Sequence, residues 1–204
     1  RTLELIPVDK GSPGRDRFLV YLDALAALGK WREVKVLLGR DHLPIETALA
    51  AVFRARAATE LKEDRLASLY WDQAHSLAAK DPAQLWFLAE YAERMGNHAE
   101  AIKAYRRLLA HERSVRSAFS ALVRLAEMEG DTLKLRELIK EITVRFPADT
   151  EPKNDLAYLN LLLRENLSEA KQSSIELVRQ NPGLLAGRTT LALAYLRAGD
   201  TRAA

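Results

Sequence analysis

A recurring interval of about 34 residues is the sequence feature that most constrains how this chain can fold. Gly96 and Gly130 lie 34 residues apart, and each follows a helix-forming stretch and precedes Asn or Asp. The interval continues in both directions, so that the full series of markers is Gly29, Glu63, Gly96, Gly130, Glu165 and Gly199. Self-similarity at such a period is typical of stacked repeat proteins. The sequence therefore predicts six copies of one small unit rather than one globular core.

Apolar residues fall at matching offsets around each marker. In the third unit Leu85 and Leu88 precede Gly96, and Ala101 and Tyr105 follow it. Steps of three and four residues keep side chains on one helix face, and glycine readily takes the left-handed backbone that ends a helix. Each unit is therefore predicted to be two amphipathic helices. One such pair cannot cover both apolar faces alone, so stacking of antiparallel pairs in an all-α fold is expected.

The markers also divide the chain. Residues 1–14 are predicted to be a linker or the end of a preceding unit, and 15–204 the helical repeat domain. Its units are expected at about 15–44, 45–81, 82–114, 115–150, 151–183 and a truncated 184–204. Asp16 is predicted to cap the first helix, and Pro44 to lie in the first turn of a long helix from Ile45 to about Lys62. The other notable predictions are helices at Leu66–Ala79, Lys153–Arg164, Ser168–Gln180 and Leu184–Ala198, and a loop at Ala148–Pro152.

Several recurring positions resemble the tetratricopeptide repeat (TPR) family. They are Ala89, Gly96, Ala101 and Tyr105 in the third unit, Pro147 closing the fourth, Ala157, Tyr158, Ala170 and Pro182 in the fifth, and Leu191–Ala204 in the last. The resemblance covers roughly residues 15–204. It implies an alpha-alpha superhelix, a right-handed solenoid of antiparallel helix pairs. It also implies a scaffold that holds a peptide or a partner domain in a concave groove.

Composition narrows the classes of function. Hydrophobic residues make up 48% of the 204 and charged residues 29%, which suits a folded helical chain. The 31 basic and 28 acidic residues are interleaved, whereas a nucleic-acid-binding domain would gather its positive charge. The absence of cysteine excludes disulfides and thiolate metal sites but leaves the compartment open. We expect a soluble domain of a bacterial protein, cytoplasmic or from the periplasm and cell envelope. No apolar run is long enough to span a membrane.

The motifs that carry catalysis are missing. The four histidines are scattered and form no metal-ligand pairing, so no metal is predicted. Ser168 and Lys171 match a serine acyl-enzyme spacing, but the companion motifs are absent, and helix capping explains the serine. No glycine-rich phosphate loop is present. The sequence therefore predicts a protein that is not an enzyme and has no cofactor and no small-molecule substrate.

A binding groove is the better prediction, and the family resemblance indicates where it lies. The first helix of each TPR pair lines the concave side, which implies a partner site formed by Phe53, Arg56, Trp86, Phe87, Glu90, Arg94, Arg124 and Glu127. Trp86 and Phe87 are adjacent, so both cannot enter one buried stripe, and at least one is expected to face the groove. The carboxylate clamp of some family members is absent, because Leu19, Asp23, Phe87, Ser117 and Ala121 occupy its positions.

The leading hypothesis is a non-catalytic protein–protein interaction scaffold. One alternative is a regulatory or substrate-presenting segment of a larger enzyme, since the chain starts without methionine and stops inside a predicted pair, as a fragment of a longer polypeptide would. Another is single-stranded nucleic-acid binding through Arg54, Arg56, Arg94, Arg106 and Arg107. A homodimer through the exposed terminal repeat is a further expectation.

Overall fold

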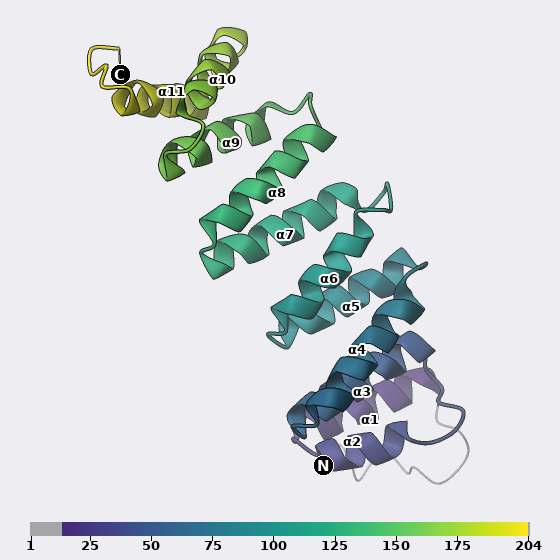
Figure 1. Ribbon diagram of the computed structural model, residues 1–204. Helices are drawn as coiled ribbons and strands as arrows, with labels where there is room; N and C mark the ends of the chain where they lie inside the picture. Colours follow the sequence, from purple (N-terminus) through teal and green to yellow (C-terminus); the bar gives the residue numbers. More distant parts are fainter. Residues whose placement is uncertain (1–13, 204) are drawn as a thin grey trace. The chain divides into compact units, whose positions relative to one another are not determined.

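The computed structural model describes residues 14–203, and within this range all regular structure is helical, with no strand (Figure 1). The helices are α1 Arg15–Ala27, α2 Trp31–Leu38, α3 Thr47–Glu60, α4 Asp64–Ala78, α5 Pro82–Arg94, α6 His98–Leu108, α7 Val115–Glu129, α8 Thr132–Arg145, α9 Thr150–Leu163, α10 Leu167–Gln180 and α11 Leu185–Arg197. The predicted all-α helical repeat is confirmed. The predicted linker, apart from Gly14, lies outside the described residues.

Six equivalent turns show the repeat at atomic detail. The first helix of each pair is followed by a residue with a left-handed backbone: Gly29, Lys62, Gly96, Gly130, Arg164 and Gly199. The next amide N–H in every turn donates to the carbonyl oxygen five residues earlier, at 2.9–3.1 Å. Lys30 to Leu25 is one such bond and Asp131 to Ala126 is another. This bond closes a Schellman turn, which satisfies carbonyls that the helix end leaves unpaired.

Two of these turns correct the predicted markers. The left-handed residues are Lys62 and Arg164, one position before the predicted markers Glu63 and Glu165. Both have a φ of 59°, and this conformation costs a residue with a Cβ roughly 1–2 kcal/mol relative to right-handed backbone. The sequence signal failed because no glycine marks these turns, although the helix-ending hydrogen bonds form there as elsewhere.

The chain divides into two compact units, the first ending at Val115 and the second starting at Arg116. In the first unit α3 packs against α2, α4 and α5 and is buried on nearly every side. Its many alanines allow this close approach. Arg54 is tolerated in this helix because its Nη2 and Nε donate to the carbonyl oxygen of Leu38, at 2.6 and 3.1 Å.

A buried polar contact joins α4 to α6 in the same unit. His75 is 1% exposed, and its Nε2 lies 2.8 Å from Oε2 of Glu100. Arg107 donates from Nη1 to the backbone oxygen of His75 at 2.6 Å. Burial lowers the pKa of His75 and outweighs the opposite effect of Glu100, while Arg107 and Lys103 lower it further. The imidazole is therefore held neutral between the two helices.

The second unit is organised around α9, which packs against α8, α10 and α11. Its core cluster consists of Ala157, Leu161, Ala170 and Ala194, with Leu193 packed against it. The small side chains from α9, α10 and α11 let three helices approach closely. No helix of the described residues is long and apolar enough to cross a membrane.

Several predicted helix ends need correction. The N-cap of α1 is Gly14, so Asp16 lies inside the first turn instead of capping it. Pro44 and Ile45 precede α3, which starts at Thr47. The smaller shifts are Asp64–Ala78 for the predicted Leu66–Ala79, Leu167–Gln180 for Ser168–Gln180, and Leu185–Arg197 for Leu184–Ala198.

The predicted loop at Ala148–Pro152 is also shorter than expected. α9 begins at Thr150, so Thr150–Pro152 belongs to its first turn. A proline is accommodated there because the first N–H groups of a helix have no intrahelical partner. At the other end, residues 201–203 form a turn, so a second helix of the last pair does not begin within the described residues.

Candidate functional site

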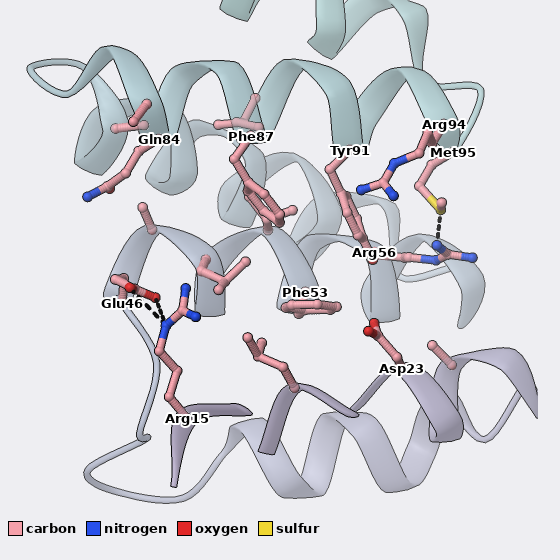
Figure 2. A pocket seen from close by; sticks show the side chains of 18 of the residues that line it. Arg15, Asp23, Glu46, Phe53, Arg56, Gln84, Phe87, Tyr91, Arg94 and Met95 are labelled. Atoms are coloured by element: carbon pink, nitrogen blue, oxygen red, sulfur yellow. Dashed lines mark hydrogen bonds and ion pairs between the residues drawn. The ribbon is translucent and has the colours of Figure 1, made fainter. Parts of the chain in front are cut away.

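A cavity of about 710 Å³ lies in the first unit, among α1, α3 and α5, the first helices of three successive pairs (Figure 2). Its lining residues at one end are Arg15, Glu46 and Gln84, and at the other end Asp23, Arg56, Arg94 and Met95. Phe53, Phe87 and Tyr91 lie between the two ends. The cavity therefore has an aromatic centre and charged ends.

The aromatic centre is a continuous wall of three rings. The centroids of Phe53 and Tyr91 are 5.3 Å apart in an edge-to-face arrangement at 67°, and those of Phe87 and Tyr91 are 5.7 Å apart and stacked at 27°. Both are favourable geometries for aromatic pairs. Phe53 and Tyr91 are buried, whereas Phe87 is half-buried. Phe87 is thus the ring of this wall that a ligand can reach most readily.

Two arginines lie beside the same tyrosine. The guanidinium carbon of Arg56 is 5.9 Å from the centroid of Tyr91 and 4.7 Å from that of Trp31, and the guanidinium carbon of Arg94 is 5.7 Å from Tyr91. These distances are within the range of cation–π attraction. Arg56 also donates from Nη1 to the sulfur of Met95 and pairs loosely with Glu60 at 3.7 Å. The rings hold both cations at one end of the cavity.

Burial also shapes the chemistry of Tyr91. It raises the pKa of the phenol to about 12, and the charge of Asp23 acts in the same direction, while Arg56 and Arg94 oppose it. The phenol is therefore neutral at physiological pH and can donate its O–H to an acceptor in the cavity.

The opposite end of the cavity is closed by paired groups. Nε of Arg15 lies 3.1 Å from Oε1 of Glu46. The pKa of Glu46 is held below its usual value first by a hydrogen bond from its own backbone amide and then by Arg15, against the effect of burial. Asp81 caps α5 by accepting from the backbone N–H of Ala83 at 2.9 Å and the side-chain amide of Gln84 at 3.0 Å. These carboxylates already have partners.

The predicted groove residues lie in four different places. Phe53, Arg56, Phe87 and Arg94 line this cavity together. Trp86 packs instead against Tyr105 of α6, with centroids 5.3 Å apart, and is not among the lining residues. Glu90 is exposed on α5, also outside the lining. Arg124 and Glu127 belong to the second unit, in a different cavity.

Tyr91 was not among the residues predicted from the sequence. Its ring contacts the two phenylalanines of the aromatic wall and lies beside both Arg56 and Arg94. The signal was present, because Tyr91 and Arg94 follow Phe87 by four and seven residues and therefore share its helix face. Arg15, Glu46 and Met95 were also missed. They lie at helix ends, where the spacing of three and four residues along a helix does not predict where a side chain points.

The cavity in the second unit has a similar volume, about 690 Å³, and is formed by α7, α8, α9 and the segment between α8 and α9. Four carboxylates line it, namely Glu127, Asp149, Glu151 and Asp155, together with the cations Arg116 and Arg124. Burial raises the pKa of Asp155, and the nearby Glu151 and Glu127 add to this effect. Arg116 pairs with Asp149 at 2.6 Å and lies 4.0 Å from the ring centroid of Phe146. This cavity is acidic.

Two of the arginines considered for nucleic-acid binding have structural partners, since Arg54 and Arg107 donate to the backbone oxygens of Leu38 and His75. Within residues 14–203 no group of three or more His, Asp or Glu side chains is placed to hold a metal ion. Comparison of the chain with protein-family models and with curated proteins gives no match.

Proposed function

We propose that this chain is a non-catalytic interaction scaffold of the tetratricopeptide type, which holds a peptide segment of a partner protein in the cavity among α1, α3 and α5. The observation that carries the proposal is the aromatic wall of Phe53, Phe87 and Tyr91 between two charged ends. Ligand sites typically combine a mostly apolar lining with a few polar groups, in volumes of about 300–1,000 Å³. The volume of about 710 Å³ falls within that range.

The shape of the lining favours an extended peptide. The lining follows α5 from Gln84 to Met95, which at 1.5 Å per helical residue is roughly 16 Å. An extended chain covers that distance with about five residues. Aromatic and arginine side chains are also the types most often found at energetically dominant positions of protein interfaces. A short linear segment can therefore contact both ends and place one side chain on Phe87.

Selection from a random-peptide phage library against the 204-residue chain tests this proposal. We expect enriched peptides whose binding, measured by fluorescence anisotropy, weakens about tenfold or more in Phe87→Ala, because truncation removes the accessible ring of the wall. The matched control is Val144→Ala on α8. Val144 is 77% exposed and is not among the residues that line this cavity. Circular dichroism checks that both variants remain helical.

Two outcomes would contradict the proposal. One is a library that yields no enriched peptide. The other is a set of enriched peptides that bind the Phe87→Ala variant as tightly as the unsubstituted chain, since the cavity would then not be their site.

A further inference from the structure

We infer that the peptide bound in this cavity carries an acidic side chain, whose carboxylate lies between Arg56 and Arg94, and a large apolar side chain that packs on Phe87. This inference rests on the function proposed above and specifies the chemistry of the partner. It is carried by the unequal way in which the charged groups at the two ends of the cavity are paired.

The two guanidinium groups at the α3 and α5 end have few partners of their own. Arg94 is exposed, forms no ion pair with any residue in 14–203, and lies against the ring of Tyr91. Nε of Arg56 is buried and has no hydrogen-bond acceptor among the described residues. Its Nη1 donates to a thioether sulfur, which is a weak acceptor, its guanidinium group also hydrogen-bonds to Tyr91, and its distance to Glu60 is 3.7 Å. This end of the cavity therefore has one buried guanidinium N–H without an acceptor, on Arg56, and a second guanidinium group without an ion pair, on Arg94.

A carboxylate is the acceptor that best suits these donors. The guanidinium group presents a planar fork that matches a carboxylate, and charge-assisted hydrogen bonds are stronger than neutral ones. Both cations also lie within 6 Å of one ring, so an anion between them would reduce their mutual repulsion. The Arg15 end offers no comparable unpaired guanidinium group, because Arg15 already pairs with Glu46.

Asp23 favours one side of the cavity for the carboxylate of the peptide. It reaches into the same end of the cavity from α1, as Figure 2 shows, and it forms no ion pair among the described residues. Its negative charge would repel an incoming carboxylate near α1 and favour the α3 and α5 side, where the arginines lie. Asp23 is therefore expected to weaken the binding that Arg94 strengthens.

The spacing along α5 gives the approximate sequence of the ligand. Phe87 and Arg94 are seven residues apart, which is roughly 10 Å along the helix axis. An extended peptide covers that distance in about three residues. The expected motif is thus a large apolar residue and an Asp or Glu about three positions away.

The peptides selected above test this inference by two substitutions of opposite sign. Arg94→Gln should weaken binding about tenfold, because a charge-assisted contact is lost. Asp23→Asn should strengthen it about two- to fivefold, because a repulsion is removed. A role limited to stabilising the fold would not produce this reversal. Arg124→Gln, the matched change in the second unit, should have no effect, and binding to the unsubstituted chain should weaken as salt is added.

Four outcomes would overturn this inference. The first is a set of peptides that bind through Phe87 but contain no enriched Asp or Glu and do not respond to Arg94→Gln; the scaffold proposal would then survive and this inference would fail. The second is binding that requires a free C-terminal carboxylate, which synthetic peptides with amidated C-termini would reveal. The third is a dimer of the chain, seen by sedimentation velocity and lost in Phe87→Ala, which would make a second copy the occupant. Absence of any bound peptide would contradict both proposals.

Discussion

The two cavities of this protein are similar in volume but differ in the balance of aromatic and charged residues that line them. Three aromatic residues, three carboxylates and three arginines line the cavity of the first unit, whereas two phenylalanines, four carboxylates and two arginines line that of the second. One position in the repeat contributes to the difference. Nine residues before the left-handed turn residue, the cavity of the first unit has Phe53 and Phe87, whereas the cavity of the second has Asp155. The repeated turns are kept in both units, so a different residue at the same place in the repeat gives each cavity a different lining.

The largest expected difference concerns the stability that the aromatic residues provide. Tyr91 is 6% exposed and contacts two rings and two arginines, so Tyr91→Ala should lower the free energy of unfolding by about 3–5 kcal/mol. Phe146→Ala in the second unit should cost clearly less, because Phe146 is half-buried and contacts one ring and Arg116. Urea denaturation followed by circular dichroism measures both values.

The control for this comparison is Tyr91→Phe, which keeps the ring and should cost much less than Tyr91→Ala. Equal losses for Tyr91→Ala and Phe146→Ala would mean that the aromatic wall of the first unit contributes no special stability. The contrast between the two cavities would then concern binding alone.

A smaller effect is expected from pH acting on His75 in the first unit. Its pKa is lowered from 6.5 in the folded protein, so the unfolded chain takes up this proton more readily. The free energy of unfolding should therefore fall as the pH drops below about 6.5 toward the folded pKa, and be fully retained above it. His75→Gln should remove this part of the pH dependence. Denaturation midpoints of both proteins at about pH 5 and about pH 8 test the prediction.

If the unsubstituted protein and His75→Gln change in parallel over this range, the buried imidazole is not responsible. His42→Gln is a suitable comparison, because His42 lies on an exposed segment between α2 and α3.

The smallest effect is expected from Asp155 in the second unit, and its sign is opposite. Its pKa is raised from 3.8 in the folded protein, so here the folded chain holds the proton more tightly. Its contribution to stability is present below about pH 4 and is lost as the pH rises through the folded pKa. Asp155→Asn should therefore be more stable than the unsubstituted protein near neutral pH and lack that decline. Urea titrations from about pH 4 to about pH 7 would show it, and a less stable variant at neutral pH would contradict it.

Much of the fold was predictable because it depends on local interactions. The bonds that close the six turns connect residues only five positions apart, and the core stripes follow the helical period. The predicted helix pairs were therefore found from the sequence. The errors at Lys62, Arg164, Pro44 and Thr150 concern helix ends, where several residues can satisfy the same unpaired groups.

The candidate site was only partly predictable. Phe53, Arg56, Phe87 and Arg94 were selected from their register, and they line one cavity. Trp86 was selected for the same reason but lies against Tyr105, because adjacent residues point about 100° apart and α6 offers an aromatic partner on that side. The register also gave no indication that Arg124 and Glu127 belong to a different unit.

The sequence by itself determined that this protein is built from repeated helix pairs, because helix formation and the turns that end helices depend on residues close together in the chain. The tertiary structure decided which of the remaining side chains meet. Tyr91 becomes the centre of the cavity only when α1, α3 and α5 come together, and the guanidinium group of Arg54 finds its acceptor in a backbone oxygen of another helix pair. These contacts join residues from different pairs, and no local pattern in the sequence specifies them.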